Sequence, residues 1–335
     1  MKMVEQNISG VKLEQQRQNA LKHHKILQKL LPVCLILFIG LALVKNRFLF
    51  VFISEYGWGN PATQGALWML AGNLIFSLLL ACSIFCCYYM LVFKKAYDLF
   101  CINFKNKYVL DTLRQLPDFS ELRYNAGGGL SYEEMNRLKL IPGGQSVFYQ
   151  SSDELSGKLG GVPFRAVNVC TGEKVSRRSS TPKILFEGQV IAFSCFDDRK
   201  ISNGFVQVFS KKGLAQMKGT RTPLPIHTEN IVFNENFAVF AENEQNAFYI
   251  LTPQVMERIT AFQEAMDGKV YLSFSEKSLY VTCSRFLNPF HIFIDIPVEE
   301  QRQRIVSDTA ILRSAREILV RAGQNGRGSC KEEMI

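Results

Sequence analysis

Residues 66–93, ALWMLAGNLIFSLLLACSIFCCYYMLVF, form an apolar block of 28 residues without a charged side chain. The longer stretch from Gly57 to Phe93 also has no charged side chain. About 20 apolar residues in a helix cross the hydrocarbon core of a bilayer, so this block is long enough to cross it with a tilt. We therefore predict a membrane-spanning helix here, which places the protein in a membrane.

A second apolar block, Leu30–Val44, precedes the first and has only 15 residues. At 1.5 Å per residue a helix of this length falls short of a full span. The helix can begin earlier, at Ile26, or it can continue through Phe48–Ile53 with Lys45 and Arg47 reaching to the headgroups. A cleaved signal peptide is the competing interpretation. The long segment before the block and the second span soon after it favour a membrane hairpin instead.

Basic residues flank both blocks on the same predicted side of the membrane. Lys12, Arg17, Lys22, Lys25 and Lys29 are among those before the first block, and Lys94, Lys95, Lys105 and Lys107 follow the second. The link between the blocks carries only Lys45 and Arg47. The positive-inside rule therefore predicts that both termini are cytoplasmic and that the short link, with Trp58, lies outside.

The net charge and its distribution along the chain indicate which kinds of partner to expect. The net charge is +9, and residues 1–29 alone hold six basic and two acidic residues. Anionic lipid headgroups attract such a basic flank by about 1 kcal/mol per residue near the surface, so membrane lipids are the expected partner. Residues 94–335 carry only a small positive excess, which argues against nucleic acid as a partner.

The cysteines predict neither a disulfide framework nor a metal site. There are nine cysteines, and no two of them form a C-x-x-C pair. Those outside the apolar blocks are expected to face a reducing cytoplasm. No motif for a metal or a cofactor stands out, and we predict none.

After the second block we expect a helix to continue as far as Pro117, because aromatic residues recur at three- and four-residue steps. Ser131 followed by Glu134 is typical of a capping box that opens a short helix. The chain is then expected to comprise a basic cytoplasmic tail (1–29), a transmembrane hairpin (30–93), membrane-proximal helices (94–144), an α+β domain (145–322) and a disordered tail (323–335).

Beyond residue 145 the pattern is mainly that of strands, short runs rich in Val, Ile, Phe and Tyr between turn residues. The predicted strands are Phe164–Cys170, Ile184–Cys195, Phe205–Phe209, Ile231–Phe233, Ala238–Ala241, Ala247–Leu251, Val270–Phe274 and Leu279–Cys283. Two helices are predicted, one from Pro253 to Met266 after an N-cap at Thr252, and one from Val298 to Arg321. The predicted fold class is α+β, with two transmembrane helices and a mainly antiparallel sheet covered on one face by these two helices.

Candidate catalytic residues are few. His227, Glu229 and Asp198 are the residue types of a general acid–base pair, although nothing in the sequence brings them together. Gly157-Lys158-Leu159-Gly160-Gly161 lacks the Ser or Thr that follows a Walker lysine, so a turn is the better interpretation. Two basic loops could contact anions or lipid headgroups; their residues are Lys174, Arg177 and Arg178, and Lys211, Lys212, Lys218 and Arg221.

Three runs of sequence carry a resemblance to a known family. They are Ile184-Leu185-Phe186-Glu187-Gly188, then VFNENFAVF at 232–240, and above all NAFYILTPQVMERI at 246–259. With them the segment after the spans resembles the bacterial family known as domain of unknown function 3137. The resemblance implies two N-terminal spans in the inner (cytoplasmic) membrane and a cytoplasmic domain, and it associates the chain with membrane proteins of the LemA type as partners. The family's acidic residues before its Tyr-Ile-Leu-Thr-Pro motif are reduced here to Glu242 and Glu244.

The expected function follows from these features. The membrane hairpin, its basic flanks and the scarcity of catalytic motifs favour a membrane-anchored binding or scaffold domain. The alternative is a hydrolase or transferase that acts on a membrane-associated substrate through His227, Glu229 and Asp198.

Overall fold

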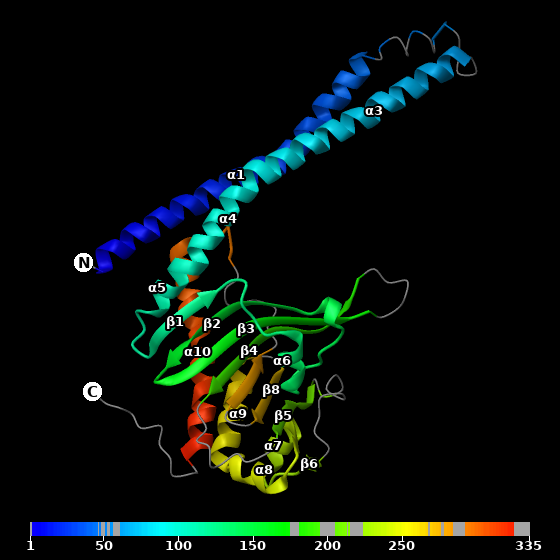
Figure 1. Ribbon diagram of the computed structural model, residues 1–335. Helices are drawn as coiled ribbons and strands as arrows, with labels where there is room; N and C mark the ends of the chain where they lie inside the picture. Colours follow the sequence, from blue (N-terminus) through cyan, green and yellow to red (C-terminus); the bar gives the residue numbers. More distant parts are fainter. Residues whose placement is uncertain are drawn as a thin grey trace. The chain divides into compact units, whose positions relative to one another are not determined.

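The structure, a computed structural model, describes residues 2–45, 47, 51, 54–55, 61–174, 181–194, 205–212, 214, 224–266, 269–275, 278–283 and 292–324 (Figure 1). The chain divides into two compact units. One, here called the hairpin unit, comprises Met1–Phe104 and Ile292–Glu299. The other, the sheet unit, comprises Lys105–His291 and Glu300–Ile335.

The hairpin unit consists mainly of two long helices that run side by side. The first is α1 (Lys2–Lys45), and the second is formed by α3 (Pro61–Tyr88), η1 (Tyr89–Phe93) and α4 (Lys94–Asn103) without a break. His23 contacts Tyr88 and Gln16 contacts Asn103, so the two helices are antiparallel. Both are long and apolar enough to cross a membrane. The predicted basic tail is therefore helical from Lys2 onwards and continues into the first apolar block.

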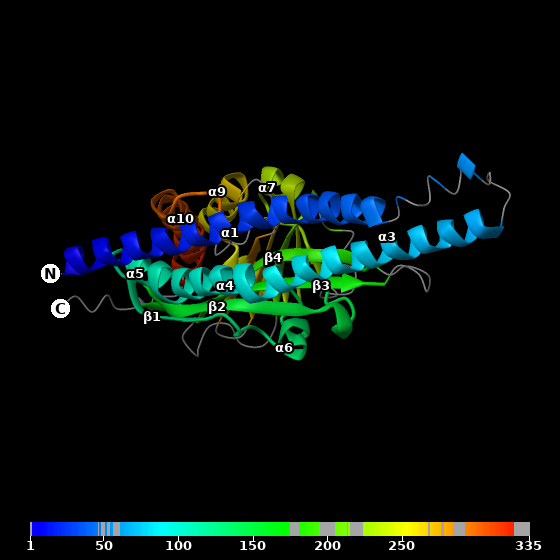
Figure 2. The same ribbon diagram turned by 90° about the horizontal axis from the view of Figure 1, so that it is seen from above.

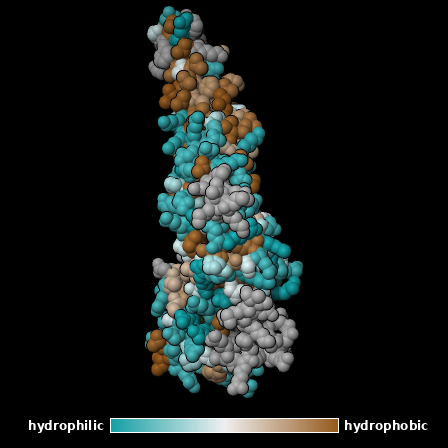
Figure 3. All heavy atoms as spheres, turned by 90° about the vertical axis from the view of Figure 1, so that its left-hand side faces the viewer, coloured by the Kyte–Doolittle hydropathy of each residue, from teal (hydrophilic) through white to brown (hydrophobic). Residues whose placement is uncertain are grey.

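Burial in the hairpin unit follows a seven-residue period. Leu13, Ala20, Leu27 and Cys34 of α1 are buried at this spacing, which is the pattern of helices that pack as a coiled coil. Other apolar side chains face outwards, and both Ile36 and Met69 are 71% exposed. This exposed apolar surface is brown in Figure 3 and gathers toward one end of the hairpin unit. An apolar surface of this extent is typical of a helix in contact with lipid.

The helix predicted to continue the second span is present, and part of it is π-helical. After α4 come η2 (Phe104–Val109) and α5 (Leu110–Leu113), and both η1 and η2 are π-helical turns. Each π turn inserts residues into the α-helical period and rotates the face that follows it. The helix ends at Leu113, shortly before Pro117 as expected.

The sheet unit contains an antiparallel sheet. In the described part of the chain its nine strands are ordered β1-β2-β3-β4-β9-β8-β5-β7-β6. They are β1 (Phe119–Asn125), β2 (Gln150–Leu159), β3 (Val162–Glu173), β4 (Lys183–Ser194), β5 (Val206–Ser210), β6 (Leu224–Ile226), β7 (Phe237–Ala241), β8 (Val270–Ser275) and β9 (Ser278–Cys283). All the pairings between them are antiparallel. The predicted fold class is confirmed.

Helices lie against both faces of this sheet. Figure 2 shows α9 (Pro253–Met266) and α10 (Val298–Gln324) on one side and α6 (Tyr132–Arg137) on the other. Apolar residues of α9 are buried against the sheet unit, namely Val255, Met256, Ile259 and Phe262. On α10 an apolar stripe is buried too, namely Ile311, Ala315, Ile318 and Leu319. The prediction that these two helices cover one face is confirmed.

The opposite face carries α6 and a separate apolar cluster. Ser131 caps α6 by accepting from the Glu134 amide at 3.1 Å, and Glu134 accepts from the Ser131 amide at 2.8 Å, which confirms the predicted capping box. Met135 then packs with strand residues from β3, β4, β5 and β8, among them Val167, Val190 and Tyr271. Both faces of the sheet are therefore covered.

Two predicted strands are wrong because asparagine caps turn their apolar runs into helices. Residues 231–233 begin α7 (Ile231–Asn236), where the Asn230 side chain accepts from the Phe233 amide. Residues 247–250 lie in α8 (Glu244–Ile250), where Asn243 accepts from the Gln245 amide. An N-cap satisfies a donor that a strand would have to pair elsewhere. The strand expected before Thr252 is therefore a helix, and the motif is helix–turn–helix.

Three strands were not predicted. β1 lies within 94–144, where only helices were expected, while β2 and β6 are short or polar segments without a clear alternation. The short helix α6 also lies in that range, and a 3-10 turn, η3 (Ser146–Phe148), follows it. The expectation for 94–144 is thus wrong at β1, which pairs with β2 at the edge of the sheet.

Candidate functional site

The predicted acid–base residues do not form a pair in the part of the chain that the structure describes. His227 and Glu229 are both exposed in the segment between β6 and α7. Thr228 between them is buried and bonded to Asn234 at 2.8 Å, which turns its two neighbours toward solvent. Asp198 lies outside the described residues. The proposed acid–base role therefore stays a prediction.

The basic loops are described only in part. Lys174 follows β3, and Lys211 and Lys212 follow β5; all three are exposed. Between β3 and β5 in the sheet lie β4, β9 and β8, so these lysines belong to well-separated strands. The other predicted contact residues, Arg177, Arg178, Lys218 and Arg221, lie outside the described residues. Contact with anions at these loops also stays a prediction.

The glycine-rich run at 157–161 is a turn, as predicted. Leu159 pairs with Val162, and between them Gly160 and Gly161 have φ of +53° and +78°. Glycine adopts this left-handed backbone without steric strain, which explains the two residues at the β2–β3 hairpin. A substrate phosphate is not needed to account for the motif.

The structure assembles a buried polar network that the sequence did not indicate. Its centre is the Asp153 carboxylate in β2, whose side chain is 7% exposed. Lys105 Nζ in η2 lies 2.7 Å from Asp153 Oδ1, and the Tyr124 hydroxyl of β1 donates to the same oxygen. Asn168 of β3 donates to Oδ2 at 3.2 Å. Four residues distant in sequence, here called the Asp153 network, thus join a helix to three strands.

The backbone at Asp153 is irregular, which aims its side chain. The register between β2 and β3 shifts between Ser152 and Leu155, and Asp153 has a φ of +56°. A β-bulge of this kind redirects a side chain that a regular strand would point elsewhere. Its amide donates outside the ladder, to the Ala126 carbonyl at 3.1 Å. A non-glycine residue with positive φ costs about 1 kcal/mol or more and persists only where its surroundings demand it.

The bulge also directs the next carboxylate to a cation. Glu154 accepts from Arg165 Nη2 at 3.0 Å, and the same nitrogen donates to the Gly129 carbonyl at 2.8 Å. The other arm of Arg165 lies 3.9 Å from Glu134, the residue of the capping box. The two neighbouring acids therefore each hold a cation: Asp153 holds Lys105 and Glu154 holds Arg165.

Within the Asp153 network, burial and the neighbouring carboxylate determine the protonation of Tyr124. Burial raises the pKa of Tyr124, and the hydrogen bond to Asp153 and the charge of that carboxylate raise it further. Tyr124 therefore keeps its proton and acts as a donor. Asp153 accepts from an ammonium, a phenol and an amide, an arrangement in which a buried carboxylate stays charged and fixed in place. The network therefore has a structural effect: it holds η2 against the sheet.

A second charged contact holds α10. Arg313 donates to both carboxylate oxygens of Asp118, from Nε at 2.6 Å and from Nη2 at 3.0 Å. The Arg313 hydrogen bond is the main cause of a lowered pKa at Asp118. Nearby, Arg316 donates to the Gly160 carbonyl of the β2–β3 turn at 3.0 Å. These contacts fix the helix to one corner of the sheet.

Between α10 and the sheet lies a small, partly open cavity. It measures about 20 Å³, and its lining includes Leu155, Gln189, Asp308 and Thr309. A space of this size matches a single water molecule with polar partners. The described residues contain no group of three or more His, Cys, Asp or Glu side chains that could hold a metal ion.

The sequence carried little signal for the Asp153 network. The segment Ser151-Ser152-Asp153-Glu154 resembles a polar loop, because a bulged strand loses its alternation. Lys105 was counted only as a basic flank of the second span. A buried aspartate inside a strand is recognised once the register of β1, β2 and β3 is known.

The runs that carry the family resemblance have structural roles. The Cβ that Gly188 lacks would lie 2.2 Å from the Cys283 carbonyl oxygen, so glycine permits β4 and β9 to pair. Asn234 fastens the loop before α7 by bonding Thr228, and Arg258 of α9 lies 3.5 Å from Glu317 of α10. Arg258 therefore forms an ion pair between two helices.

No curated protein and no solved structure matches the chain. A family model does match, over residues 184–315, which run from β4 into α10 and contain all three runs of the predicted resemblance. The Asp153 network lies before this segment. Over residues 184–315 the chain matches the family described as Protein of unknown function (DUF3137), which confirms the resemblance seen in the sequence.

Proposed function

We propose that this protein is a membrane-anchored binding or scaffold protein of the bacterial inner membrane, with both termini in the cytoplasm. The hairpin unit anchors it, and the sheet unit presents a surface to a partner protein. The observation that carries the proposal is the placement of exposed apolar side chains, which occur on the hairpin and again on two short helices of the sheet unit.

The surface on the sheet unit, here called the α7–α8 surface, consists of Ile231, Val232, Phe248 and Tyr249. Their exposed fractions are 73%, 62%, 45% and 41%. Both α7 and α8 lie against β7, at the β6 edge of the sheet. Exposed large apolar residues grouped on neighbouring elements mark binding surfaces more often than ordinary surface.

Acidic residues surround the α7–α8 surface. Glu229 precedes α7, Glu235 lies within it, and Glu244 begins α8; all three are exposed. An apolar centre with a carboxylate rim is complementary to a partner that presents apolar side chains flanked by lysine or arginine. This charge pattern identifies the kind of partner, a protein with a basic rim.

The membrane topology is tested with reporter fusions at Ile335 and at Asn60 in the link. A cytoplasm-dependent reporter is expected to be active at Ile335, and a periplasm-dependent one at Asn60. A periplasmic reporter that works at Ile335 would overturn the topology.

The binding role is tested on the full chain, extracted in mild detergent and captured by an affinity tag. The double variant Ile231→Asp, Val232→Asp should lose proteins that co-purify with wild type. The matched control, Val147→Asp with Ile184→Asp, changes apolar residues that are 82% and 54% exposed elsewhere on the sheet unit and should retain them. If wild type, the Ile231/Val232 double variant and the control variant captured the partner equally, the proposal would be contradicted.

A charge test sharpens the result. Glu235→Lys with Glu244→Lys should weaken capture of the same partner, and added salt should weaken wild-type capture in the same direction. A membrane protein of the LemA type is the partner that the resemblance implies, and the identity of the captured protein tests that prediction.

A further inference from the structure

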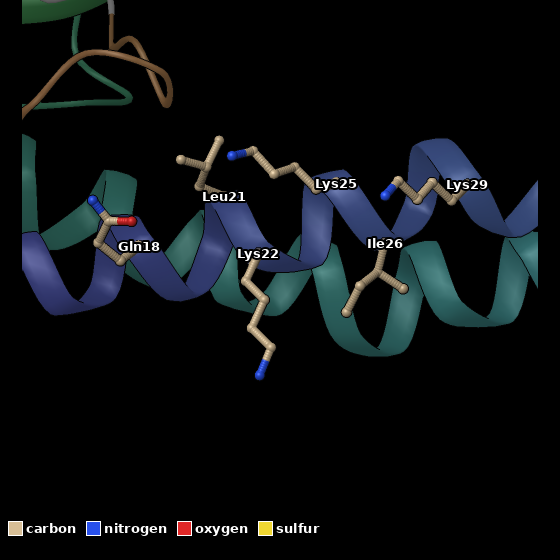
Figure 4. Close-up of a pocket in the computed structure, with 6 residues that line it drawn as sticks. All are labelled: Gln18, Leu21, Lys22, Lys25, Ile26 and Lys29. Carbon is tan, nitrogen blue, oxygen red and sulfur yellow. The ribbon is translucent and has the colours of Figure 1, made fainter.

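We propose that α1 carries a binding site for an anionic phospholipid headgroup, formed by Lys22, Lys25 and Lys29. The three lysines border a shallow, open depression of about 310 Å³ on the surface of the helix, together with Gln18, Leu21 and Ile26. Every lining residue belongs to α1, and Figure 4 shows that Lys25 and Lys29 extend back along the helix toward its N-terminal end. This inference does not depend on the proposed partner surface of the sheet unit.

The lining residues occupy one face of α1 that is separate from its packed face. Positions 18, 21, 22, 25, 26 and 29 recur at three- and four-residue steps, while the buried stripe runs through Leu13, Ala20 and Leu27. All three lysines are exposed. The site therefore faces away from the contact between α1 and the second helix of the hairpin.

The lysine charges lack a protein counter-charge within the described part of the chain. No ion pair involves Lys22, Lys25 or Lys29 there, and the nearest acid on α1, Glu14, is bonded to Arg17 and to the Val298 amide. Lysines three and four residues apart repel each other and destabilise a helix by a few tenths of a kcal/mol per pair. An anion between them removes that repulsion.

The position along α1 selects a lipid as the source of the anion. Lys29 directly precedes Leu30, the first residue of the apolar block. At 1.5 Å per residue, Lys29, Lys25 and Lys22 stand about 2, 8 and 12 Å outside that block along the helix axis. The headgroup layer on each side of the hydrocarbon core is roughly 5–8 Å thick, so two lysines lie within it and the third reaches it with its side chain.

The lining matches the two chemical parts of a phospholipid. The lysine ammonium groups can donate to phosphate oxygens, Lys25 and Lys29 from one side of this face and Lys22 from the other (Figure 4). Leu21 and Ile26 supply apolar surface beside them, and Ile26 is 38% exposed. A headgroup phosphate with the adjoining glycerol and first methylenes has this combination of charge and apolar surface, whereas a soluble anion has only the charge.

The test uses the full chain in lipid nanodiscs of phosphatidylcholine that contain a minority of phosphatidylglycerol. Native mass spectrometry after release counts which lipid stays bound. Wild type should retain phosphatidylglycerol preferentially. The triple variant K22Q/K25Q/K29Q should lower this preference by on the order of a hundredfold, since each lysine near the surface contributes roughly a fivefold preference.

Two further triple variants serve as controls. K22R/K25R/K29R keeps the charges and should keep the preference. K174Q/K211Q/K212Q removes the same number of exposed lysines from the sheet unit and should keep it too. Glutamine supports a helix about as well as lysine, and unchanged far-UV circular dichroism confirms that the variants fold.

Three outcomes overturn the inference. One is an unchanged lipid preference in K22Q/K25Q/K29Q. Another is an equal loss in K174Q/K211Q/K212Q, which would indicate attraction by net charge instead of a site. The last is displacement of bound phosphatidylglycerol by inorganic phosphate at constant ionic strength, which would identify the groove as a site for soluble anions.

Discussion

Ile75 in the hairpin unit and Ile259 in the sheet unit have the same side chain in opposite surroundings. Ile75 on α3 is 61% exposed, whereas Ile259 on α9 is fully buried. The hairpin turns its apolar surface outwards, and the sheet unit encloses its own between helices and strands. The difference fits a hairpin whose helices are long and apolar enough to cross a membrane and a sheet unit that has a core of its own, since a large exposed apolar surface is costly in water.

The largest effect is expected from placing a charge at each of these positions. Ile259→Asp should destabilise the sheet unit by several kcal/mol, enough to unfold a domain of ordinary stability. Ile75→Asp should leave the thermal unfolding of the sheet unit unchanged and reduce membrane insertion, because aspartate in mid-bilayer costs about 3 kcal/mol. Thermal denaturation of the detergent-solubilised chain and fractionation of membranes measure the two defects. Similar unfolding in both variants would contradict the comparison.

The sheet unit buries a charged group as well as apolar ones, namely the carboxylate of the Asp153 network. Asp153→Asn keeps the size of the side chain and tolerates its positive φ, but it leaves the Lys105 charge without its anion. We expect a loss of about 3 kcal/mol in the free energy of unfolding, measured with chemical denaturant.

A double-mutant cycle with Lys105→Met isolates the contribution of the pair. If Asp153 and Lys105 act together, the double variant should lose less than the sum of the two single losses. Additive losses would show that the carboxylate does not hold η2 through this lysine.

Gly188 tests the close pairing of β4 with β9. A Cβ there would meet the Cys283 carbonyl oxygen at 2.2 Å, so Gly188→Ala should cost about 2 kcal/mol through strain in the sheet. The control is Gly127→Ala, where the added Cβ meets only Asn125 Oδ1 at 3.9 Å. Unfolding midpoints of the two variants give the measurement, and equal midpoints would mean that the strands can separate without cost.

The smallest effect concerns the half-exposed pair of Asp118 and Arg313, whose side chains are 31% and 39% exposed. Asp118→Asn should cost no more than about 1 kcal/mol at neutral pH, since water screens the pair. Because folding lowers the pKa of Asp118 below its ordinary value of 3.8, the contribution is complete above that value and is lost as the pH falls through the lowered pKa.

The pH dependence is measured as the difference in unfolding free energy between wild type and Asp118→Asn. This difference should be full above the ordinary pKa of 3.8 and should shrink as the pH falls below it. A difference that grows on acidification would contradict the assigned direction of the shift.

Local sequence signals predicted most helices and six of the nine strands in the described part of the chain. The capping box at Ser131, Pro253 at the start of α9 and the apolar stripe of α10 each act within a few residues. The failures at α7 and α8 were also local, because Asn230 and Asn243 cap helices whose apolar runs resemble strands. In those cases a polar residue outside the run outweighed the propensity of the residues within it.

The candidate sites divide in the same way. The lysine site on α1 could be predicted from the sequence, because spacing along a single helix determines which side chains share a face. The Asp153 network was missed, because Lys105, Tyr124, Asp153 and Asn168 come from four elements and meet only through the register of three strands.

Two long apolar helices, a basic flank beside the first and an α+β domain after them can be read from the amino-acid sequence alone. These properties depend on length, hydropathy and charge, which are additive along the chain. The burial of one carboxylate, the bulge that redirects it and the glycine that permits two strands to meet are visible only in the folded chain. Those features depend on pairings between distant residues, and a shift of one residue in register would place every one of those side chains on the other face of the sheet.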